Sequence, residues 1–336
     1  MKNILFIATG GTIASKHSEN GLKPQIKPQE LLEYIPQVKS VCNISVEQLL
    51  NLDSSNIEPE HWRMMVECIR RNYDHYDGFV IAHGTDTMAY TAAALSYMIQ
   101  NSTKPIVITG SQKPIDMDIT DAKTNLIDSF VYASDEKSQG VQLIFDGKVI
   151  AGTRAKKVRS KSYNAFSSID FPSLAVIQDM NIMRYLPMIP YEEPVHFYPE
   201  MNDRIFLLKL IPGIRPDILS FIFEHYDAII IESFGVGGIP HSIREEFCEL
   251  YQKYPDKVII MATQVAHEGS DMTVYEVGNE MKTICNFLET YDMTLESAIA
   301  KTMWMLANVD LKEQDREDVF YNSVNYDVIF GKNRKC

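Results

Sequence analysis

Short apolar runs alternate along this chain with segments in which apolar residues recur every three or four positions. A run of about five residues rich in β-branched side chains is typical of a buried strand, and such runs are found in sheets that helices cover on both faces. Seven runs predict strands: Ile4–Ala8, Gly78–Ala82, Pro105–Thr109, Val141–Phe145, Ile205–Leu210, Ala228–Glu232 and Val258–Ala262.

Helical patterns lie between these runs. In Pro59–Arg70 the proline suits a first helical turn, and the apolar residues fall on one face. Met88–Gln100 predicts a second helix, and Thr294 predicts the cap of a third, with Glu296 in its first turn. The alternation predicts an α/β fold with a larger N-terminal domain, whose mostly parallel sheet is flanked by helices, and a smaller C-terminal α/β domain.

Four prolines between about Tyr185 and Asp203 interrupt any periodicity, which is typical of a linker between domains. We therefore expect an N-terminal catalytic domain at 1–184, a linker at 185–203 and a C-terminal domain at 204–336.

Composition excludes several classes of function. The formal net charge of −13 disfavours a nucleic-acid partner, although residues 156–161 form a local basic stretch. No apolar run reaches the roughly 18 residues of a membrane span, and the first apolar run is too short for a signal peptide. Five scattered cysteines predict a reducing, cytoplasmic compartment, and the histidines show no metal-binding pattern. We expect neither a metal nor another cofactor.

Two predicted strands end in turns rich in hydroxyl groups. The first turn contains Gly10-Gly11-Thr12, in which the glycines allow a sharp turn and a close approach to a ligand. The second contains His83-Gly84-Thr85-Asp86 just before a helix, whose N-terminus offers free N–H groups to an anion. Ligands of open α/β sheets bind at such strand ends, and neither turn fits a nucleotide-phosphate motif.

Simpler structural roles would also explain each of these residues. Thr85 and Asp86 are typical helix caps, and a Gly-Gly pair after a strand is most often only a turn. His83 fits a packed, hydrogen-bonded histidine better than a base, and Lys157 fits a solvated lysine. The residues alone therefore predict an α/β protein with a hydroxyl-rich crevice, and nothing more specific.

Two segments, TGGTIA at 9–14 and HGTDTM at 83–88, resemble the paired threonine signatures of the bacterial-type L-asparaginase family. Further matches follow in chain order: DSSN (53–56), VITGSQ (107–112), GTRAKK (152–157), SFGVGG (233–238) and YDMTLESA (291–298). The matches span nearly the whole chain, and the cytoplasmic (type I) branch is the most similar.

The resemblance implies an L-asparaginase that acts on L-asparagine through a threonine acyl-enzyme and assembles as a homodimer or homotetramer. It makes Thr12 the nucleophile and Lys157 the base of a second catalytic unit with Thr85 and Asp86. A threonine hydroxyl is a weak nucleophile that needs such a base, and a lysine serves as one only in its neutral form.

The same resemblance assigns substrate contacts. Ser54 and Ser55, beside Asp53, would hold the α-carboxylate, and Asp86 would hold the α-ammonium group. Backbone N–H groups at the turns of Gly11 and Thr85 would stabilise the oxyanion.

The chain departs from the family pattern at several positions. Many members carry a tyrosine in a mobile loop after the first signature, where this chain has Leu22. We expect Lys16–Lys27 to form that loop, as a lid over bound substrate. Glu232, Val265 and Lys156 differ from the residues expected at a regulatory asparagine site, so the sequence does not predict allosteric regulation.

Two other functions compete with this one. An asparaginase-like subunit of a glutaminyl-tRNA amidotransferase shares the signatures but carries an extension before its first strand. A non-catalytic amino-acid-binding module would need only Ser54 and Asp86, and would have little use for Thr12, Thr85 and Lys157 together.

Overall fold

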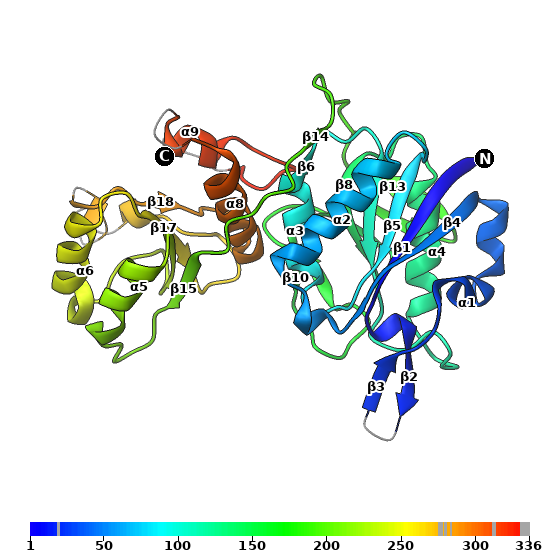
Figure 1. The fold of residues 1–336 in the computed structure, drawn as a ribbon, viewed down its shortest axis with the longest axis horizontal. Coiled ribbons are helices and arrows are strands. Elements are labelled where there is room, and N and C mark those ends of the chain that lie inside the picture. The colour runs from blue at the N-terminus through cyan, green and yellow to red at the C-terminus, as the bar shows by residue number, and fades with distance from the viewer. Residues whose placement is uncertain (19–20, 275–277, 279–280, 283, 311–313, 330–336) are drawn as a thin grey trace. The chain divides into compact units, whose positions relative to one another are not determined.

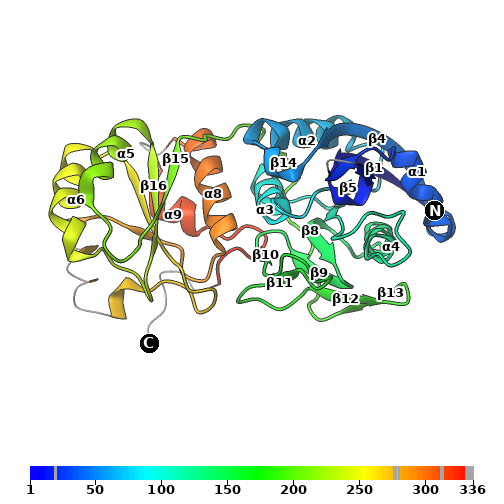
Figure 2. The same cartoon turned by 90° about the horizontal axis from the view of Figure 1, so that it is seen from below.

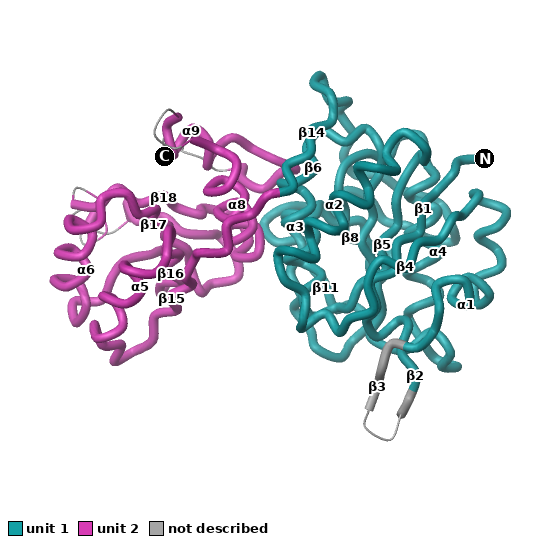
Figure 3. Tube along the Cα trace, viewed as in Figure 1, with its two compact units in different colours: residues 1–199 teal, residues 200–336 magenta. Residues whose placement is uncertain are grey.

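The computed structural model of this chain describes residues 1–18, 21–274, 278, 281–282, 284–310 and 314–329. The chain divides into two compact units, Met1–Pro199 and Glu200–Cys336 (Figure 3). The division falls inside the segment 185–203 that we expect to be a linker.

An eight-stranded sheet forms the centre of unit 1, in the order β13-β12-β9-β8-β7-β5-β1-β4. The five strands from β8 to β4 are parallel, and β9, β12 and β13 extend the sheet by antiparallel pairing. In chain order the strands are β1 (Lys2–Gly10), β4 (Cys42–Leu52), β5 (Gly78–Ala82), β7 (Pro105–Thr109), β8 (Gly140–Phe145), β9 (Lys148–Ala151), β12 (Ala175–Gln178) and β13 (Asn181–Arg184).

Helices cover both faces of this sheet, as its buried strands require. Figure 2 shows α3 and α4 on opposite faces, with α2 beside α3. The helices are α1 (Pro28–Glu33), α2 (Pro59–Asn72), α3 (Met88–Met98) and α4 (Ala122–Ala133), with 3-10 turns η1 (Thr12–Ala14), η2 (Pro36–Ser40) and η3 (Ser54–Asn56).

Three short strand pairs complete unit 1. They are β2 (Ser15–Ser18) with β3 (Gly21–Pro24), β10 (Ala155–Lys157) with β11 (Phe166–Ser168), and β6 (Ile99–Gln100) with β14 (His196–Phe197), all antiparallel. Strand β14 lies within the expected linker segment, so that part of the segment is structured as part of unit 1.

Unit 2 contains a four-stranded parallel sheet in the order β15-β16-β17-β18. Helices α5 and α6 pack on this sheet through a shared apolar core (Figure 1). Its elements are β15 (Ile205–Lys209), η4 (Pro216–Ile218), α5 (Leu219–His225), β16 (Ala228–Ser233), α6 (His241–Lys253), β17 (Val258–Thr263), η5 (Met272–Val274), β18 (Leu288–Glu289), α8 (Leu295–Asn308) and α9 (Arg316–Tyr321). Among the described residues, no helix combines the length and the apolar character needed to cross a membrane.

The predicted fold class is confirmed: both units are α/β, and the larger sheet is mostly parallel. All seven predicted strands are present, and the hydroxyl of Thr294 caps α8 by accepting a hydrogen bond from the N–H of Ser297. The prediction for α3 was too long, because the chain leaves the helix at Met98 and Ile99–Gln100 pairs with β14 as strand β6.

Candidate active site

Three neighbouring parallel strands end at the same edge of the large sheet. β5 lies between β1 and β7, and Ala82 is in register with Ala8 on one side and with Thr109 on the other. The turns that follow these strands therefore meet at the carboxyl edge, where ligands of open α/β sheets bind.

The first two turns touch backbone to backbone. A Cβ atom on Gly11 would lie 2.5 Å from both the Cα and the N of Gly84, and Gly11 has a φ of +80°. Only glycine is compatible with both the conformation and the contact. The N–H of Gly11 itself donates to the carbonyl of Leu52 at 3.0 Å. The conformation of Gly11 is what lets the two turns meet, and an oxyanion contact from the N–H groups of this turn stays a prediction.

Thr12 begins the turn η1 directly after Gly11 and is partly exposed. Within the described part of the chain, its hydroxyl has no hydrogen-bond partner. The contact between Gly11 and Gly84 places this turn next to the one that carries Thr85. Thr12 thus presents an uncommitted hydroxyl at the edge where ligands are expected.

Lys157 joins the second turn from the end of strand β10. Its Nζ donates to Oγ1 of Thr85 at 2.7 Å and to Oδ1 of Asp86 at 2.6 Å. The lysine side chain is 18% exposed and the Asp86 side chain is 67% exposed, so the amine is shielded while the carboxylate faces outward. The structure therefore brings Lys157 into contact with two residues that are distant in the sequence, Thr85 at a separation of 72 positions and Asp86 at 71.

Neither Thr85 nor Asp86 caps the helix that follows them. Thr87 occupies the N-cap position of α3, and no side chain caps the helix there. The hydroxyl of Thr87 instead donates to the carbonyl of Ser54 at 2.7 Å. The capping role that the sequence offered for Thr85 and Asp86 is thus excluded, and Lys157 is their partner.

Ser54 lies against the second turn and is buried. Its Oγ accepts a hydrogen bond from the N–H of Asp86 at 3.3 Å, and a Cβ on Gly84 would lie 2.6 Å from the same oxygen. The serine hydroxyl therefore lies where the turns containing Gly11 and Gly84 meet.

Asp53 and Ser55 bond to each other in this turn. Oδ1 of Asp53 accepts from both the N–H and the hydroxyl of Ser55, at 2.9 and 2.8 Å. The backbone hydrogen bond is the main cause of a lowered pKa for the Asp53 carboxyl. These contacts stabilise the turn that presents Ser54, and direct contact of either residue with substrate stays a prediction.

His83 is a packed histidine, as the sequence suggested. It is fully buried; its Nδ1 donates to the carbonyl of Gly84 at 2.7 Å, and its Nε2 accepts from the hydroxyl of Thr91 at 3.0 Å. Trp62 Nε1 donates to that same hydroxyl at 3.0 Å. Burial lowers the pKa of His83 to about 4, so the ring is neutral near pH 7 and holds the second turn in place.

The sequence interpretation missed Gln112, which follows the third strand end. Its Oε1 accepts from the hydroxyl of Thr85 at 3.3 Å, and its Nε2 donates to the carbonyl of Ser162 at 3.2 Å. Gln112 lies within the VITGSQ match, directly after Gly110 and Ser111. Its position after a strand that ends at the same edge was the available signal.

The segment expected to form a lid contains the antiparallel pair β2–β3, in which Leu22 is in register with His17. The side chain of Leu22 lies outside the described part of the chain, as do residues 19–20. The lid function of this segment stays a prediction.

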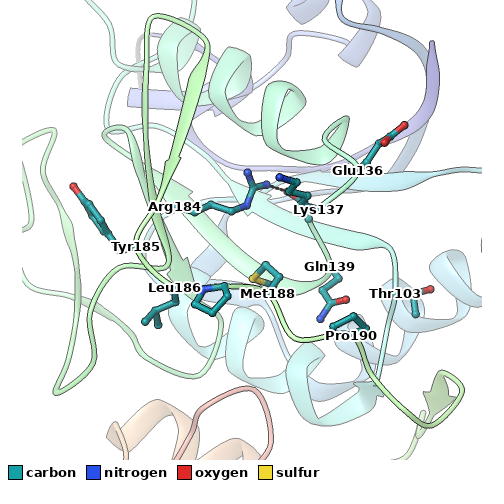
Figure 4. Close-up of a pocket in the computed structure, with 11 residues that line it drawn as sticks. Thr103, Glu136, Lys137, Gln139, Arg184, Tyr185, Leu186, Met188 and Pro190 are labelled. Atoms are coloured by element: carbon teal, nitrogen blue, oxygen red, sulfur yellow. Dashed lines mark hydrogen bonds between the residues drawn. The ribbon is translucent and has the colours of Figure 1, made fainter.

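A cavity of about 630 Å³ lies elsewhere in unit 1 (Figure 4). Its lining residues include Ser138, Arg184, Met188 and Pro190. Residues 136–139 precede β8, so this cavity lies at the amino ends of the parallel strands, at the edge of the sheet opposite the turns that carry Thr12 and Thr85. Nη2 of Arg184 is already bonded to Asp135 and to Ser138, so this arginine stabilises the wall of the cavity.

Comparison with known protein families finds a match for each of the two units. Residues 3–188 match the family model "Asparaginase, N-terminal", and residues 204–320 match "Glutaminase/Asparaginase C-terminal domain". The chain belongs to the asparaginase family. Within it, the chain is 37% identical to the L-asparaginase of Thermococcus kodakarensis over 313 residues, which cover 92% of this chain and 94% of that protein.

Two further comparisons define the range of the similarity. The solved structure of the thermostable L-asparaginase from Thermococcus kodakarensis matches 98% of this chain and 100% of its own, with a TM-score of 0.89 and 33% identity. One subunit of the glutamyl-tRNA(Gln) amidotransferase of Metallosphaera sedula is 31% identical, over 93% of this chain and 74% of that protein. The relatives thus include proteins with both of the enzymatic functions that the sequence raised.

Proposed function

We propose that this chain is an L-asparaginase, which hydrolyses L-asparagine to L-aspartate and ammonia through an acyl-enzyme on Thr12. The observation that carries the proposal is the hydrogen bonding of Lys157 Nζ to both Thr85 and Asp86, on the turn next to the one that carries Thr12. Membership of the asparaginase family supports it.

In the first half-reaction, Oγ1 of Thr12 attacks the carbon of the side-chain amide. A C–O bond forms, the hydroxyl proton is transferred to the amide nitrogen, and the C–N bond breaks to release ammonia. In its neutral form Lys157 accepts a proton through the hydroxyl of Thr85, with which its Nζ is in hydrogen-bond contact at 2.7 Å.

In the second half-reaction, water attacks the ester carbon of the acyl-enzyme. The water gives up one proton, Thr12 regains its own, and L-aspartate leaves. The same Thr85–Lys157 unit serves again, because deacylation retraces the proton transfers of acylation with water in place of ammonia.

Substrate binding follows from charge and exposure. The exposed carboxylate of Asp86 suits the α-ammonium group, and the hydroxyl of Ser54 suits the α-carboxylate. Both contacts hold the amino acid at a fixed distance from Thr12, which limits the reacting amide to a short side chain.

The tRNA-dependent amidotransferase is the second candidate, because relatives with that name share the family. The net charge of −13 opposes a tRNA partner, which supports the free amino acid as substrate. A non-catalytic binding module would not require a lysine held on a threonine hydroxyl.

An ammonia-release assay with L-asparagine and L-glutamine tests the proposal. We expect turnover of L-asparagine, and mass spectrometry of the acid-quenched reaction should find an aspartyl ester on the peptide that contains Thr12. Absence of ammonia from free asparagine, with release from glutamine only in the presence of an aminoacyl-tRNA, would favour the amidotransferase.

We further infer a cytoplasmic homodimer or homotetramer. Ile119 is 73% exposed and Val158 is 41% exposed, and the hydroxyl of Tyr163 ties the hairpin containing Val158 to the carbonyl of Ile119. These apolar side chains beside the Lys157 hairpin suit a covered surface. Light scattering that finds an active monomer at assay concentration would contradict the assembly, and activity in a secreted fraction would contradict the location.

A further inference from the structure

The amide of Gln112 joins Thr85 to the hairpin that carries Lys157. Its oxygen accepts from Thr85 and its nitrogen donates to Ser162, in the loop between β10 and β11. An amide has both an acceptor and a donor, and these two contacts require both. The glutamine side chain therefore links the two parts of the Thr85–Lys157 unit.

The backbone of Gln112 is itself held firmly. Oδ2 of Asp121 accepts from the N–H of Gln112 at 2.8 Å, and Oδ1 accepts from the N–H of Lys113 at 3.1 Å. Asn125 on α4 donates to the carbonyl of Gly110 at 2.9 Å. The buried carboxylate of Asp121 and the amide of Asn125 thus fix the turn from which the glutamine side chain extends.

The loop between β10 and β11 rests on this same turn. Besides the bond from Gln112 to Ser162, the hydroxyl of Tyr163 donates to the carbonyl of Ile119 at 3.2 Å, and the ammonium group of Lys113 lies 5.8 Å from the centre of the Tyr163 ring. Lys157 lies at the start of this loop. The position of its amine therefore depends on how the loop is held.

The orientation of the Thr85 hydroxyl follows from its two partners. A hydroxyl has one proton to donate, and Gln112 accepts it. The oxygen lone pairs are then directed to Nζ of Lys157, which donates to Thr85 as an ammonium group. A neutral amine at Lys157 would compete with Gln112 for the single proton of this hydroxyl, so the amide of Gln112 favours the orientation seen here.

We propose that Gln112 is a positioning residue of this active site, which orients the hydroxyl of Thr85 and holds the Lys157 hairpin against it. A role for Gln112 in catalysis rests on the proposed function. The dependence of the Lys157–Thr85 contact on the amide of Gln112 is a structural claim that holds whatever the substrate is.

Two variants test it by steady-state kinetics across pH. Gln112→Met removes both hydrogen bonds at similar length, and we expect kcat to fall about tenfold to a hundredfold with KM within about twofold. Gln112→Glu keeps an acceptor for Thr85 but adds a negative charge that favours the ammonium form of Lys157. The rising limb of its kcat profile should move to higher pH, with partial recovery of kcat there.

Gln178→Glu is the matched control, because it makes the same change at an exposed glutamine on β12. We expect its profile to coincide with that of the wild type. A Gln112→Glu enzyme that loses the same fraction of activity at every pH would reduce Gln112 to a structural role. A Gln112→Met enzyme changed only in KM would make it a substrate contact; both results overturn the proposal.

The crystal structure of Gln112→Met separates this inference from the proposed function. We expect Nζ of Lys157 to move out of hydrogen-bond distance of Thr85, or the Thr85 hydroxyl to change rotamer. A Lys157–Thr85 contact and a rotamer both unchanged from the wild type would refute the positioning role even if the wild type proved inactive on asparagine. Conversely, a wild-type enzyme that releases no ammonia refutes the proposed function. The positioning role of Gln112 is then still tested by the Lys157–Thr85 contact and the Thr85 rotamer in the Gln112→Met structure.

Discussion

Gly11 and Gly84 lie so close together that a methyl group on Gly11 would stand 2.5 Å from the Cα of Gly84. This contact joins the turns after β1 and β5, which carry Thr12 and Thr85. It explains why each threonine signature contains glycine next to its threonine: the two hydroxyl-bearing turns approach each other only where neither has a side chain between them.

Gly11→Ala should therefore inactivate the enzyme by forcing the two turns apart. Gly213→Ala is the matched control, because Gly213 has a similar φ, +84° against +80°, but no atom within 4 Å of the added Cβ. We expect both variants to lose stability to backbone strain, by about 1–2 kcal/mol for Gly213→Ala and by more for Gly11→Ala, whose methyl group also meets Gly84. Only Gly11→Ala should lose ammonia release, by more than about a hundredfold. Equal activity losses in the two variants would show that strain alone, and not the turn contact, is responsible.

Thr12→Val should abolish turnover while leaving the fold intact, because the substitution is nearly isosteric and removes a hydroxyl that stabilises nothing else in the described chain. The expected loss in kcat is at least about 10³-fold, as for removal of a nucleophile. Thr12→Ser keeps the hydroxyl and should retain measurable turnover. The unfolding midpoints of both variants should match the wild type. A valine variant that keeps more than about a tenth of the wild-type kcat would exclude Thr12 as the nucleophile.

Lys157→Met and Asp86→Asn should separate chemistry from binding. In the proposed mechanism the lysine amine moves protons in the transition state, so its loss should lower kcat by about 10²–10⁴-fold with a small change in KM. Asp86 is 67% exposed and suits the substrate ammonium, so Asp86→Asn should raise KM as well as lower kcat. Initial rates over a range of asparagine concentrations measure both constants. Purely KM effects in both variants would contradict these roles.

The elements that the sequence predicted well are those whose signals are local. The apolar runs of β5 and β7 coincide with the observed strands residue for residue, and the capping hydroxyl of Thr294 begins α8 as expected. These signals lie within a few residues of the structure that they specify, so no distant contact is needed to interpret them.

The elements that the residues alone could not predict depend on distant partners. β4 was missed because its residues are mostly partly buried or exposed, and its pairing with β1 sets its place in the sheet. Thr85 and Asp86 looked like helix caps because capping is local, whereas Lys157 reaches them from a hairpin more than 70 residues away. Family resemblance supplied that association, and it supplied no role for Gln112.

Asp128 is an unusual buried acid on α4. It is 5% exposed, and its Oδ2 has no hydrogen-bond partner among the described residues. Burial raises the pKa of this carboxyl to about 7, and no charged side chain contributes to the shift. The folded protein therefore favours the protonated acid at pH values where an unfolded chain, with an ordinary aspartate pKa near 3.8, carries a negative charge at this position.

The contribution of Asp128 to the stability of the protein should consequently fall as pH rises towards the pKa of its carboxyl. Between about pH 4 and 7 the folded state binds one more proton than the unfolded state at this residue, so its burial is least costly at low pH and most costly above 7. Over pH 5 to 7 we expect a loss of about 2 kcal/mol in the free energy of unfolding from this group. Asp128→Asn cannot titrate and keeps the shape of the side chain, so other groups contribute equally to both proteins.

Urea unfolding of the wild type and Asp128→Asn at about pH 5, 6, 7 and 8 isolates the contribution of Asp128. The asparagine variant should gain stability relative to the wild type with each step up to about pH 7. Folding of the wild type at these pH values requires Asp128 either to take up a proton or to be buried as a charged group, and the variant avoids both costs. Above the folded-state pKa of about 7 both states of the wild type are ionised at this position, so the difference should level off. A difference between the two proteins that stays constant over the whole range would show that Asp128 does not titrate there.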